Sequence, residues 1–359
     1  MSLSPLDDYP VHQISGVMRH VATSDRNFYD RYYFNCFPIS GDMMLIIGVG
    51  QYPNLGVTDA FALLRRGTAH QVVRASRELG ADRMDTSVGP FRVEVIEGLK
   101  RLRVVLEECG HGLAFDLTWT GSIPATLEPR HYLRWQERVV FDSTRLAQTG
   151  RWEGVIEHGG ERIAVTPDRW WGARDRSWGI RPVGEPEPPG IQARNSGTFY
   201  WMYAPMQFAD HSILAIVQED EKGRRLLEEA VRVWPDPDRE PDFLGRPDYR
   251  PVYAPGTRDA VSATIAFTPW DAEPFEVQVT PLLPVHIMVG TGYGLEPDWR
   301  HGMYQGEKPV VQGVVHDTEQ EADRFWGLVD AAARFTYGEH EGYGLYEYWA
   351  LGDHPSLRP

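Results

Sequence analysis

The middle of the chain carries the run Trp170-Trp171-Gly172-Ala173-Arg174-Asp175-Arg176-Ser177-Trp178-Gly179-Ile180-Arg181-Pro182. Large aromatic side chains favour burial, whereas fixed charges resist it, so this mixture is unusual for a surface loop. A buried polar cluster walled by indole rings reconciles the two tendencies, with Asp175 paired to an arginine. The run is therefore expected either to perform chemistry or to hold two halves of the molecule together.

In extended form this run would divide its side chains between two faces of a strand. Arg174, Arg176 and Trp178 would share one face. Asp175 and Ser177 would share the other face. A bulge at a glycine of the run would shift this alternation, so the sequence leaves open which face points inward. As sequence neighbours of Asp175, the two arginines are expected to lower its pKa and to keep the carboxylate ionised.

Strand patterns with a period of two surround the run. In Leu113-Ala114-Phe115-Asp116-Leu117-Thr118-Trp119-Thr120 the large apolar residues alternate with smaller or polar ones, as in a half-buried antiparallel strand. Similar runs cover residues 91–96, 102–106 and 155–157, and turn signals such as residues 158–161 separate them. Many short strands with frequent turns indicate an all-β sandwich or barrel.

The pattern that begins near residue 30 recurs near residue 195. Residues 32–38 followed by 43–49 read as an aromatic strand and an apolar strand, and residues 199–205 followed by 213–217 repeat this order. Closely spaced prolines and glycines in residues 183–190 predict an extended connector. We therefore expect an N-terminal barrel over residues 1–183, a linker over 184–194 and a C-terminal barrel over 195–359.

One segment near the C-terminus has helical spacing instead. Apolar residues fall on one side of a helix at Ala322, Phe325, Trp326, Val329 and Ala333. An aspartate or threonine at 317 or 318 can cap its first turn. This pattern predicts a helix near the C-terminus that packs on the second barrel.

Charge and composition narrow the class of protein. The 359 residues hold 36 Lys and Arg against 51 Asp and Glu, and the resulting net charge of −15 repels nucleic acid and anionic membrane surfaces. The two cysteines, Cys36 and Cys109, form neither a disulfide framework nor a metal-binding pair by spacing. The amino terminus lacks a basic region followed by an apolar run, and nowhere do eighteen apolar residues occur in succession, so we expect a cytoplasmic protein.

Motifs spread over most of the chain carry a family resemblance. They are Gln51-Tyr52-Pro53-Asn54-Leu55-Gly56 with Asp59, residues 73–77, 88–90 and 148–150, the run 171–179, Gly292-Tyr293-Gly294, Trp299-Arg300-His301-Gly302, and Gly342-Tyr343-Gly344-Leu345-Tyr346-Glu347. With these motifs the chain resembles an uncharacterised bacterial branch of the lipocalin-like, two-barrel family of carotenoid 1,2-hydratase, AttH and kievitone-hydratase-like proteins. The Arg-Asp-x-Ser-Trp-Gly run at 174–179 is the most specific of them.

The resemblance implies two tandem antiparallel lipocalin-like (calycin) barrels with a cavity for a hydrophobic ligand in or between them. It also implies that hydratases and cyclases of this kind act without a metal or an organic cofactor. A single reaction does not follow from it, because one fold supports several chemistries.

The candidate catalytic residues are Asp175, His301 and Tyr293. A carboxylic acid buried among indole rings can protonate an alkene and stabilise the resulting positive charge. His301 is expected to titrate near neutral pH. Candidate substrate-binding residues are Trp171, Arg174, Ser177, Trp178, Trp299 and Glu307. A structural ion pair at Asp175, and a barrel corner with an interface histidine at 290–301, are the alternatives.

The leading hypothesis is a cofactor-independent hydratase, isomerase or cyclase. Its substrate would be a hydrophobic terpenoid, steroid-like, aromatic or polyketide-derived molecule of secondary metabolism. The alternative is a non-catalytic, lipocalin-type carrier of such a molecule, and a third possibility is an interaction module without a cavity. A carboxylate or imidazole at the cavity wall would favour the enzyme over the carrier. A homodimer stays open.

No metal site is expected. His340 lies between Glu339 and Glu341, but alternate residues of a strand cannot all face one ion, so this segment is interpreted as a solvated loop. His211 beside Asp210 is interpreted as turn chemistry. Residues 290–294 do not precede a helix, so nucleotide binding is rejected as well.

Overall fold

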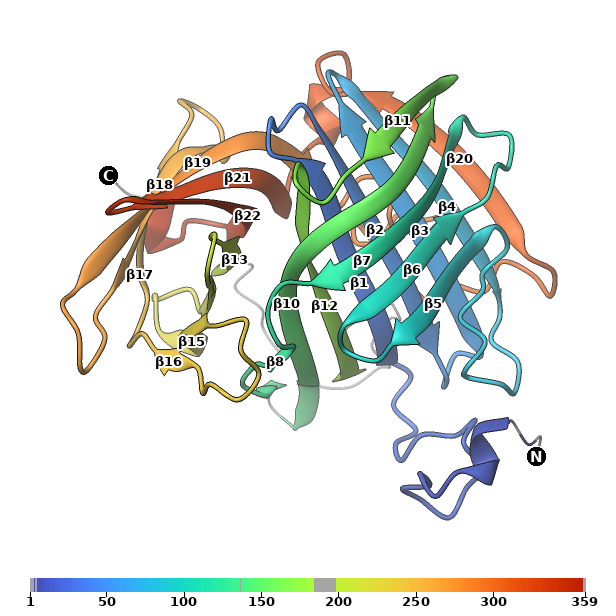
Figure 1. Ribbon diagram of the computed structural model, residues 1–359. Helices are drawn as coiled ribbons and strands as arrows, with labels where there is room; N and C mark the ends of the chain where they lie inside the picture. The colour runs from blue at the N-terminus through green and yellow to red at the C-terminus, as the bar shows by residue number, and fades with distance from the viewer. Residues whose placement is uncertain (1–2, 4, 136, 184–197, 358–359) are drawn as a thin grey trace.

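The computed structural model describes residues 3, 5–135, 137–183 and 198–357, and Figure 1 shows their arrangement. Two large antiparallel β-sheets lie side by side, and almost all regular structure belongs to them. This confirms the predicted all-β fold of two antiparallel bodies. Within the ranges just given, no helix is long and apolar enough to cross a membrane.

The first sheet curls into a barrel-like body, and the strands along its main path run in the order β20-β4-β3-β2-β1-β12-β10-β7-β6-β5. The long strand β10 also pairs with β8, β9 and β11. The bounds are β1 (Phe28–Pro38), β2 (Met43–Tyr52), β3 (Val57–Arg66), β4 (Ala69–Glu78), β5 (Phe91–Glu97), β6 (Arg101–Leu106), β7 (Leu113–Gly121), β8 (Thr126–Leu127), β9 (His131–Trp135), β10 (Arg138–His158), β11 (Glu161–Val165), β12 (Trp170–Ile180) and β20 (Val310–Asp317).

The second sheet has the strand order β16-β15-β14-β13-β22-β21-β19-β18-β17. Its bounds are β13 (Phe199–Gln207), β14 (Ser212–Glu219), β15 (Arg225–Val233), β16 (Asp242–Phe243), β17 (Asp248–Tyr253), β18 (Ala260–Phe267), β19 (Phe275–His286), β21 (Val329–Tyr337) and β22 (His340–Leu351). The predicted repeat corresponds to two antiparallel hairpins, β1–β2 and β13–β14. Each hairpin lies inside its own sheet.

The predicted C-terminal helix is wrong. Helical turns in the described chain are limited to the 3₁₀ segments η1 (Pro5–Asp8), η2 (Ala322–Arg324) and η3 (Pro355–Leu357). Residues from Val329 onward form β21, which pairs with β19 on one side and β22 on the other. Ala331 and Ala333 are buried on one face of β21 and Ala332 on the other. Burial on both faces removes the alternation that identifies a strand, so the helical spacing there is a coincidence.

The two sheets consist of successive parts of the chain, with one strand as an exception. Strands β1–β12 form the first sheet and later strands the second, but β20 returns to pair with β4 in the first sheet. The predicted linker at 184–194 lies outside the described residues. The division into domains at 183 and 195 therefore stays a prediction.

The central strands of both sheets bury both of their faces. Phe34 and Cys36 of β1 belong to the core of the first sheet, whereas Tyr33 and Phe37 belong to a second apolar cluster. That second cluster also contains Tyr203 and other residues of the second sheet, so it is the core of the interface. Because side chains alternate along a strand, one strand supplies both its own core and the contact between the sheets.

Candidate functional site

A cavity of about 850 Å³ lies between the two sheets. Alternate residues of β1, β10 and β12 form one wall, and alternate residues of β13, β14 and β22 form the opposite wall. The cavity is lined on the first sheet by Tyr33, Arg145 and Asp175, and on the second by Trp201 and Glu347. Each of these side chains points away from the core of its own sheet. The site therefore belongs to the interface and not to the interior of either body.

Asp175 reaches the cavity because β12 is fully extended at this point. It lies opposite Tyr33 of β1 and Ala147 of β10, and it is half-buried. Ser177, two residues later on the same face, hydrogen-bonds the Asp175 carboxylate and also lines the cavity. Burial raises the pKa of Asp175, while the positive charges of Arg145 and the other arginines of the cavity oppose that shift.

The arginines next to Asp175 in the sequence face the other way. Arg174 is buried, and its Nε donates to Oε1 of Gln148 at 2.8 Å. Arg176 bonds Asp30 and lies over the ring of Tyr32 at 4.3 Å. The arginines that lower the pKa of Asp175 most are Arg145, Arg181 and Arg31. Arg174 also interacts with the Asp175 charge, but it is not among the largest causes, because neighbours in an extended strand point to opposite faces.

Two further carboxyl groups face each other on the second sheet. Asp330 of β21 is fully buried and lies directly opposite Glu347 of β22. The Tyr33 hydroxyl donates to Asp330 across the interface, and the Trp201 indole N–H donates to Glu347. Burial raises the pKa of Asp330 well above its ordinary value and raises that of Glu347. Two buried carboxyl groups this close hold a shared proton, because both cannot ionise together.

Arg145 joins these acids to the first sheet. Its side chain bonds the buried Glu128 and lies over the ring of Tyr203 at 4.2 Å and that of Trp201 at 5.4 Å. Burial raises the pKa of Glu128, and the charge of Arg145 opposes that shift. The cavity wall therefore combines fixed positive charge, carboxyl groups and aromatic faces within one enclosed space.

Tyr293 and His301 enter the cavity from the loop that joins β19 to β20. The His301 ring packs edge-on against Tyr293 at 4.4 Å and stacks on Phe61 at 6.4 Å. Its Nε2 bonds the carbonyl oxygen of Thr291 at 3.2 Å, which leaves Nδ1 as the acceptor of the neutral ring. Burial, Arg31 and Arg181 lower the pKa of His301 well below its ordinary value. The expected titration near neutral pH is therefore wrong.

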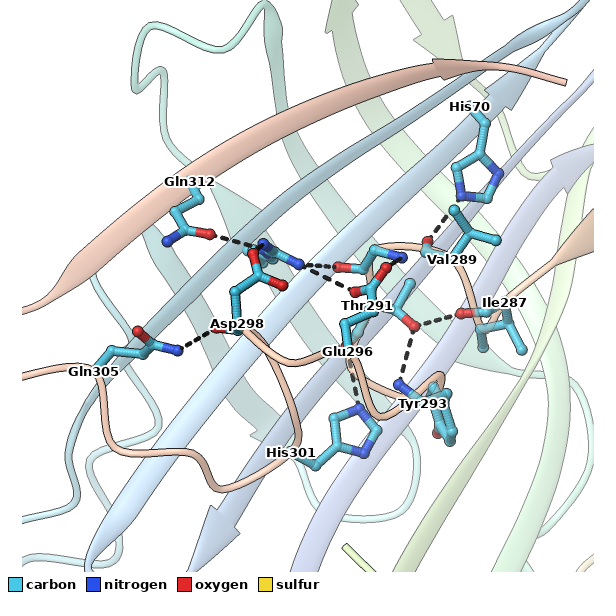
Figure 2. A network of polar contacts seen from close by, with 12 residues as sticks. His70, Ile287, Val289, Thr291, Tyr293, Glu296, Asp298, His301, Gln305 and Gln312 are labelled. Carbon is cyan, nitrogen blue, oxygen red and sulfur yellow. Dashed lines mark hydrogen bonds and ion pairs between the residues drawn. The ribbon is translucent and has the colours of Figure 1, made fainter. Parts of the chain in front are cut away.

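Arg74 of β4 holds this loop in place. Figure 2 shows its partners Asp298 and Gln312 in the polar network around the loop. Its guanidinium donates to the carbonyl of Gly290 at 3.1 Å, to Asp298 at 2.8 Å and to Gln312 at 3.0 Å. It also lies over the indole of Trp299 at 4.6 Å. The glycine-rich segment and Trp299 are thus fixed by contacts below the cavity, and Trp299 does not line it.

A second polar chain ties the same loop to the first sheet. Arg31 donates to the Tyr52 hydroxyl at 2.7 Å, which in turn bonds Asp59 at 3.2 Å. The other oxygen of Asp59 accepts the backbone N–H of Gly302 at 2.7 Å. Burial raises the pKa of Asp59 to about 6. This chain explains why Tyr52, Asp59 and Gly302 appear among the motifs of the sequence.

The structure brings four of the nine predicted site residues to the cavity: Asp175, Ser177, Tyr293 and His301. The others lie elsewhere. Trp171 packs between Arg151 and Tyr343, and Arg174 lies on the opposite face of β12 from Asp175. Trp299 packs over Arg74. Trp178, which is 36% exposed, and Glu307 lie at the surface. None of these five side chains lines the cavity in the described chain.

Sequence reasoning missed Tyr33, Arg145 and Trp201 and the pair Asp330–Glu347. Asp330 stands alone among apolar residues at 329–333, and an isolated acid in such a run is a signal of a buried functional group. Interpreting that run as a helix hid the pairing with Glu347. Arg145 carries no local signal, because its partners come from strands distant in the sequence.

Comparisons with known proteins agree with this fold. The model of a family of unknown function (DUF8625) matches residues 3–357. No curated protein matches the chain by sequence. The structure of an AttH-like protein from Nitrosomonas europaea is similar, with a TM-score of 0.57 and 16% sequence identity. The match covers 96% of this chain and 98% of the Nitrosomonas protein.

Two other solved structures share the arrangement. CghA with Sch210972 has a TM-score of 0.50 and 11% identity, and covers 91% of this chain and 89% of that chain. Kievitone hydratase from Nectria haematococca has a TM-score of 0.46 and 12% identity, and the match covers 89% of this chain and 88% of the hydratase. At these identities the likeness shows the fold, and the resemblance predicted from the sequence motifs is confirmed at that level.

Proposed function

We propose that this chain, which belongs to the DUF8625 family of unknown function, is an enzyme that performs acid–base chemistry on a hydrophobic small molecule without an organic cofactor. The observation that carries the proposal is a pair of half-buried carboxyl groups, Asp175 and Glu347, on opposite walls of one aromatic cavity. A carrier needs only an apolar cavity, whereas carboxyl groups at the wall are costly to bury without partners and are not needed to hold an apolar ligand.

The two carboxyl groups have different environments. Glu347 shares a proton with Asp330, and burial favours the protonated form of this pair. Burial raises the pKa of Asp175 too, but three arginines oppose that rise, whereas the pKa of Asp330 is raised well above its ordinary value. Groups whose environments differ in this way can serve as the acid and the base of one reaction. We therefore assign proton donation to the Asp330–Glu347 pair and proton removal to Asp175.

This arrangement supports hydration, isomerisation or cyclisation. The proton of the Asp330–Glu347 pair would pass through Glu347 to an alkene or carbonyl of the substrate, and the rings of Tyr33 and Trp201 would face the positive charge that develops. Asp175 would then take a proton from an adjacent carbon or from an attacking water, which restores the overall proton balance. The proposed substrate is a terpenoid, steroid-like, aromatic or polyketide-derived molecule, and the volume of about 850 Å³ and the aromatic lining of the cavity support a substrate of this kind.

The test begins with the ligand itself. Native mass spectrometry of the protein purified from its host identifies a co-purified hydrophobic molecule, and related compounds are then incubated with the protein in D₂O. Deuterium incorporation into product is the expected sign of acid–base turnover. Asp175→Asn and Glu347→Gln should each lower kcat at least about a hundredfold, because general acid–base catalysis contributes about 10²–10⁴.

Asp116→Asn is the matched control, since Asp116 pairs with Arg103 on the surface of the first body. Thermal unfolding and far-UV circular dichroism show whether each variant is folded. Turnover that survives in both folded cavity variants would contradict the acid–base assignment. Binding of the ligand with no turnover or deuterium exchange in the native protein would establish the carrier instead.

A further inference from the structure

Two turns of the second sheet meet at one of its ends, away from the residues of the large cavity. The turn at Asp210 joins β13 to β14, and the turn at 338–339 joins β21 to β22. Because β13 pairs with β22, with Gln207 opposite Tyr343, the two turns become neighbours although about 130 residues separate them. This pairing brings His211 and His340 to the same place.

A glycine allows the close approach of these turns. A side chain at Gly342 would place its Cβ 2.3 Å from the carbonyl oxygen of Gln207 and 2.6 Å from the ring of Phe208. Without that side chain, β22 lies directly against the end of β13. The His340 ring can then stack on Tyr337 at 4.6 Å and stand edge-on to His211 at 5.4 Å.

Aromatic packing and hydrogen bonds fix the orientation of His211. Its ring stacks on Phe208 at 4.9 Å, and the residue is 3% exposed. Nδ1 bonds the Asp210 carboxylate at 2.7 Å, and Nε2 accepts the Tyr337 hydroxyl at 2.6 Å. A hydroxyl such as that of Tyr337 on one ring nitrogen is a contact that can orient a metal-binding imidazole, and the other nitrogen, Nδ1, faces the Asp210 carboxylate.

We propose that Asp210, His211 and His340 bind one divalent transition-metal ion of the zinc type. Each residue offers one ligand atom, and the three atoms lie within 4.8 Å of one another. Ligands at about 2.0–2.1 Å from a tetrahedral Zn²⁺ are about 3.3 Å apart, so the exposed side chains of Asp210 and His340 need to close by up to about 1.5 Å. Two imidazoles and one carboxylate suit Zn²⁺, Co²⁺ or Ni²⁺ better than Mg²⁺ or Ca²⁺.

The surroundings provide a fourth position. A small pocket of about 190 Å³, lined by Asp210, His211 and Ser122, opens beside the ligands and has room for water. An ion bound at His211 Nδ1 would move the single imidazole proton from Nδ1 to Nε2, and Nε2–H would then donate to the Tyr337 oxygen. Burial, and more weakly the charge of Arg232, lower the pKa of His211, and that charge also opposes a bound cation.

The bound ion would link the β13–β14 and β21–β22 turns, and it is independent of the acid–base chemistry in the large cavity. The sequence interpretation of His340 as a solvated loop residue, and of Asp210–His211 as turn chemistry, considered each segment alone. Only the strand pairing places the third ligand beside the first two.

The experiment uses the full chain without an affinity tag, dialysed against EDTA and then titrated with ZnCl₂ by calorimetry. The expected result is one ion per chain and a higher Tm in the presence of Zn²⁺. His340→Ala and Asp210→Asn should each weaken binding at least about tenfold and reduce the rise in Tm. With CoCl₂, the native protein should show visible d–d absorption that His340→Ala lacks.

His12→Ala is the matched control, because His12 forms a similar ion pair with Asp7 at 2.7 Å on the surface but does not belong to the three-residue cluster. It should bind as the native protein does. Binding that is equal in the native protein and in His340→Ala, or that exceeds one ion per chain and falls equally in His12→Ala, would overturn the proposal. So would the lack of saturable binding of either metal.

Discussion

At the scale of single residues, strand alternation decides which charges act on Asp175. Its sequence neighbours Arg174 and Arg176 point to the other face, and the arginines that most strongly oppose the rise of its pKa are Arg145, Arg181 and Arg31. Adjacency in an extended strand separates side chains, whereas adjacency across strands brings them together. The electrostatic environment of the carboxylate is therefore a property of the sheet.

Asp59 gives a prediction about pH. Burial raises its pKa from 3.8 to about 6, so the folded protein holds this proton more tightly than the unfolded chain does. The stability that this proton contributes is complete below pH 4 and is lost as the pH rises through 6. The loss amounts to about 3 kcal/mol at most, because each pKa unit corresponds to about 1.4 kcal/mol.

Asp59→Asn removes this dependence and keeps an oxygen that can accept from Gly302 N–H. Urea unfolding at pH 4, 5, 6 and 7 should show the native protein losing stability relative to the variant across this range. Asp271→Asn, on an exposed loop, controls for the loss of a carboxylate at the surface. A constant difference between native protein and Asp59→Asn from pH 4 to 7 would contradict the prediction.

At the scale of elements, β12 is the strand on which both bodies depend. It pairs with β1 on one side and β10 on the other, and it packs against β22 of the second sheet. The run quoted at the start of the sequence analysis is therefore a central strand with both faces in use. One face carries Arg174 into the first body, and the other carries Asp175 and Ser177 to the cavity.

Gly172 permits the close packing of this strand. A Cβ at this position would lie 2.0 Å from the carbonyl oxygen of Asn35 and 2.9 Å from Nε1 of Trp152. Gly172→Ala should lower the free energy of unfolding by about 1–3 kcal/mol or more, since backbone cannot move aside as a flexible side chain can. Thermal and urea unfolding measure this change. Gly98→Ala is the control, because a Cβ at Gly98 meets nothing within 4 Å, and it should leave the free energy of unfolding almost unchanged. Equal stability of the two variants would disprove the packing argument.

At the scale of the whole molecule, two sheets each use one face for their own core and the other face for the interface. The interface core and the cavity lie on the same shared surface. Acidic groups from both sheets meet at this surface: Glu128 follows β8 of the first sheet, and Glu229 belongs to β15 of the second. Their relative ionisation affects how the sheets hold together.

The raised pKa of Glu229 leads to a prediction of how pH changes the stability of the protein. Partial burial, and then the charge of Glu128, raise the pKa of Glu229 to about 7. A raised carboxyl pKa means that stability is lost as pH rises from about 4.5 through 7. Glu229→Gln should therefore be more stable than the native protein at pH 8, with the advantage disappearing at pH 4.5.

Thermal unfolding at both pH values measures the effect. Glu228→Gln is the control, because Glu228 pairs with Arg225 and Arg246 and its loss should not stabilise the protein. A native protein that is as stable as Glu229→Gln at pH 8 would show that the two carboxyl groups do not repel.

The sequence by itself determined the fold class and the strands that carry it. Alternation in residues 113–120, the paired hairpins near 30 and 200, and the motif at 171–179 depend on local periodicity and turn chemistry, which a sequence displays directly. The same local information placed Asp175, Ser177, Tyr293 and His301 among the candidates. It failed at 329–333, where alanines buried on both faces of a strand imitate a helix.

Only the tertiary structure decided which residues meet. It placed the cavity between the sheets, set Asp175 opposite Glu347 and Asp330, and brought His340 beside Asp210 and His211. The physical reason is that each of these groups depends on strand pairing and sheet packing between segments about 130 to 170 residues apart. Burial and charge then shift the pKa values of the assembled groups, and neither acts on a side chain until its distant neighbours are in place.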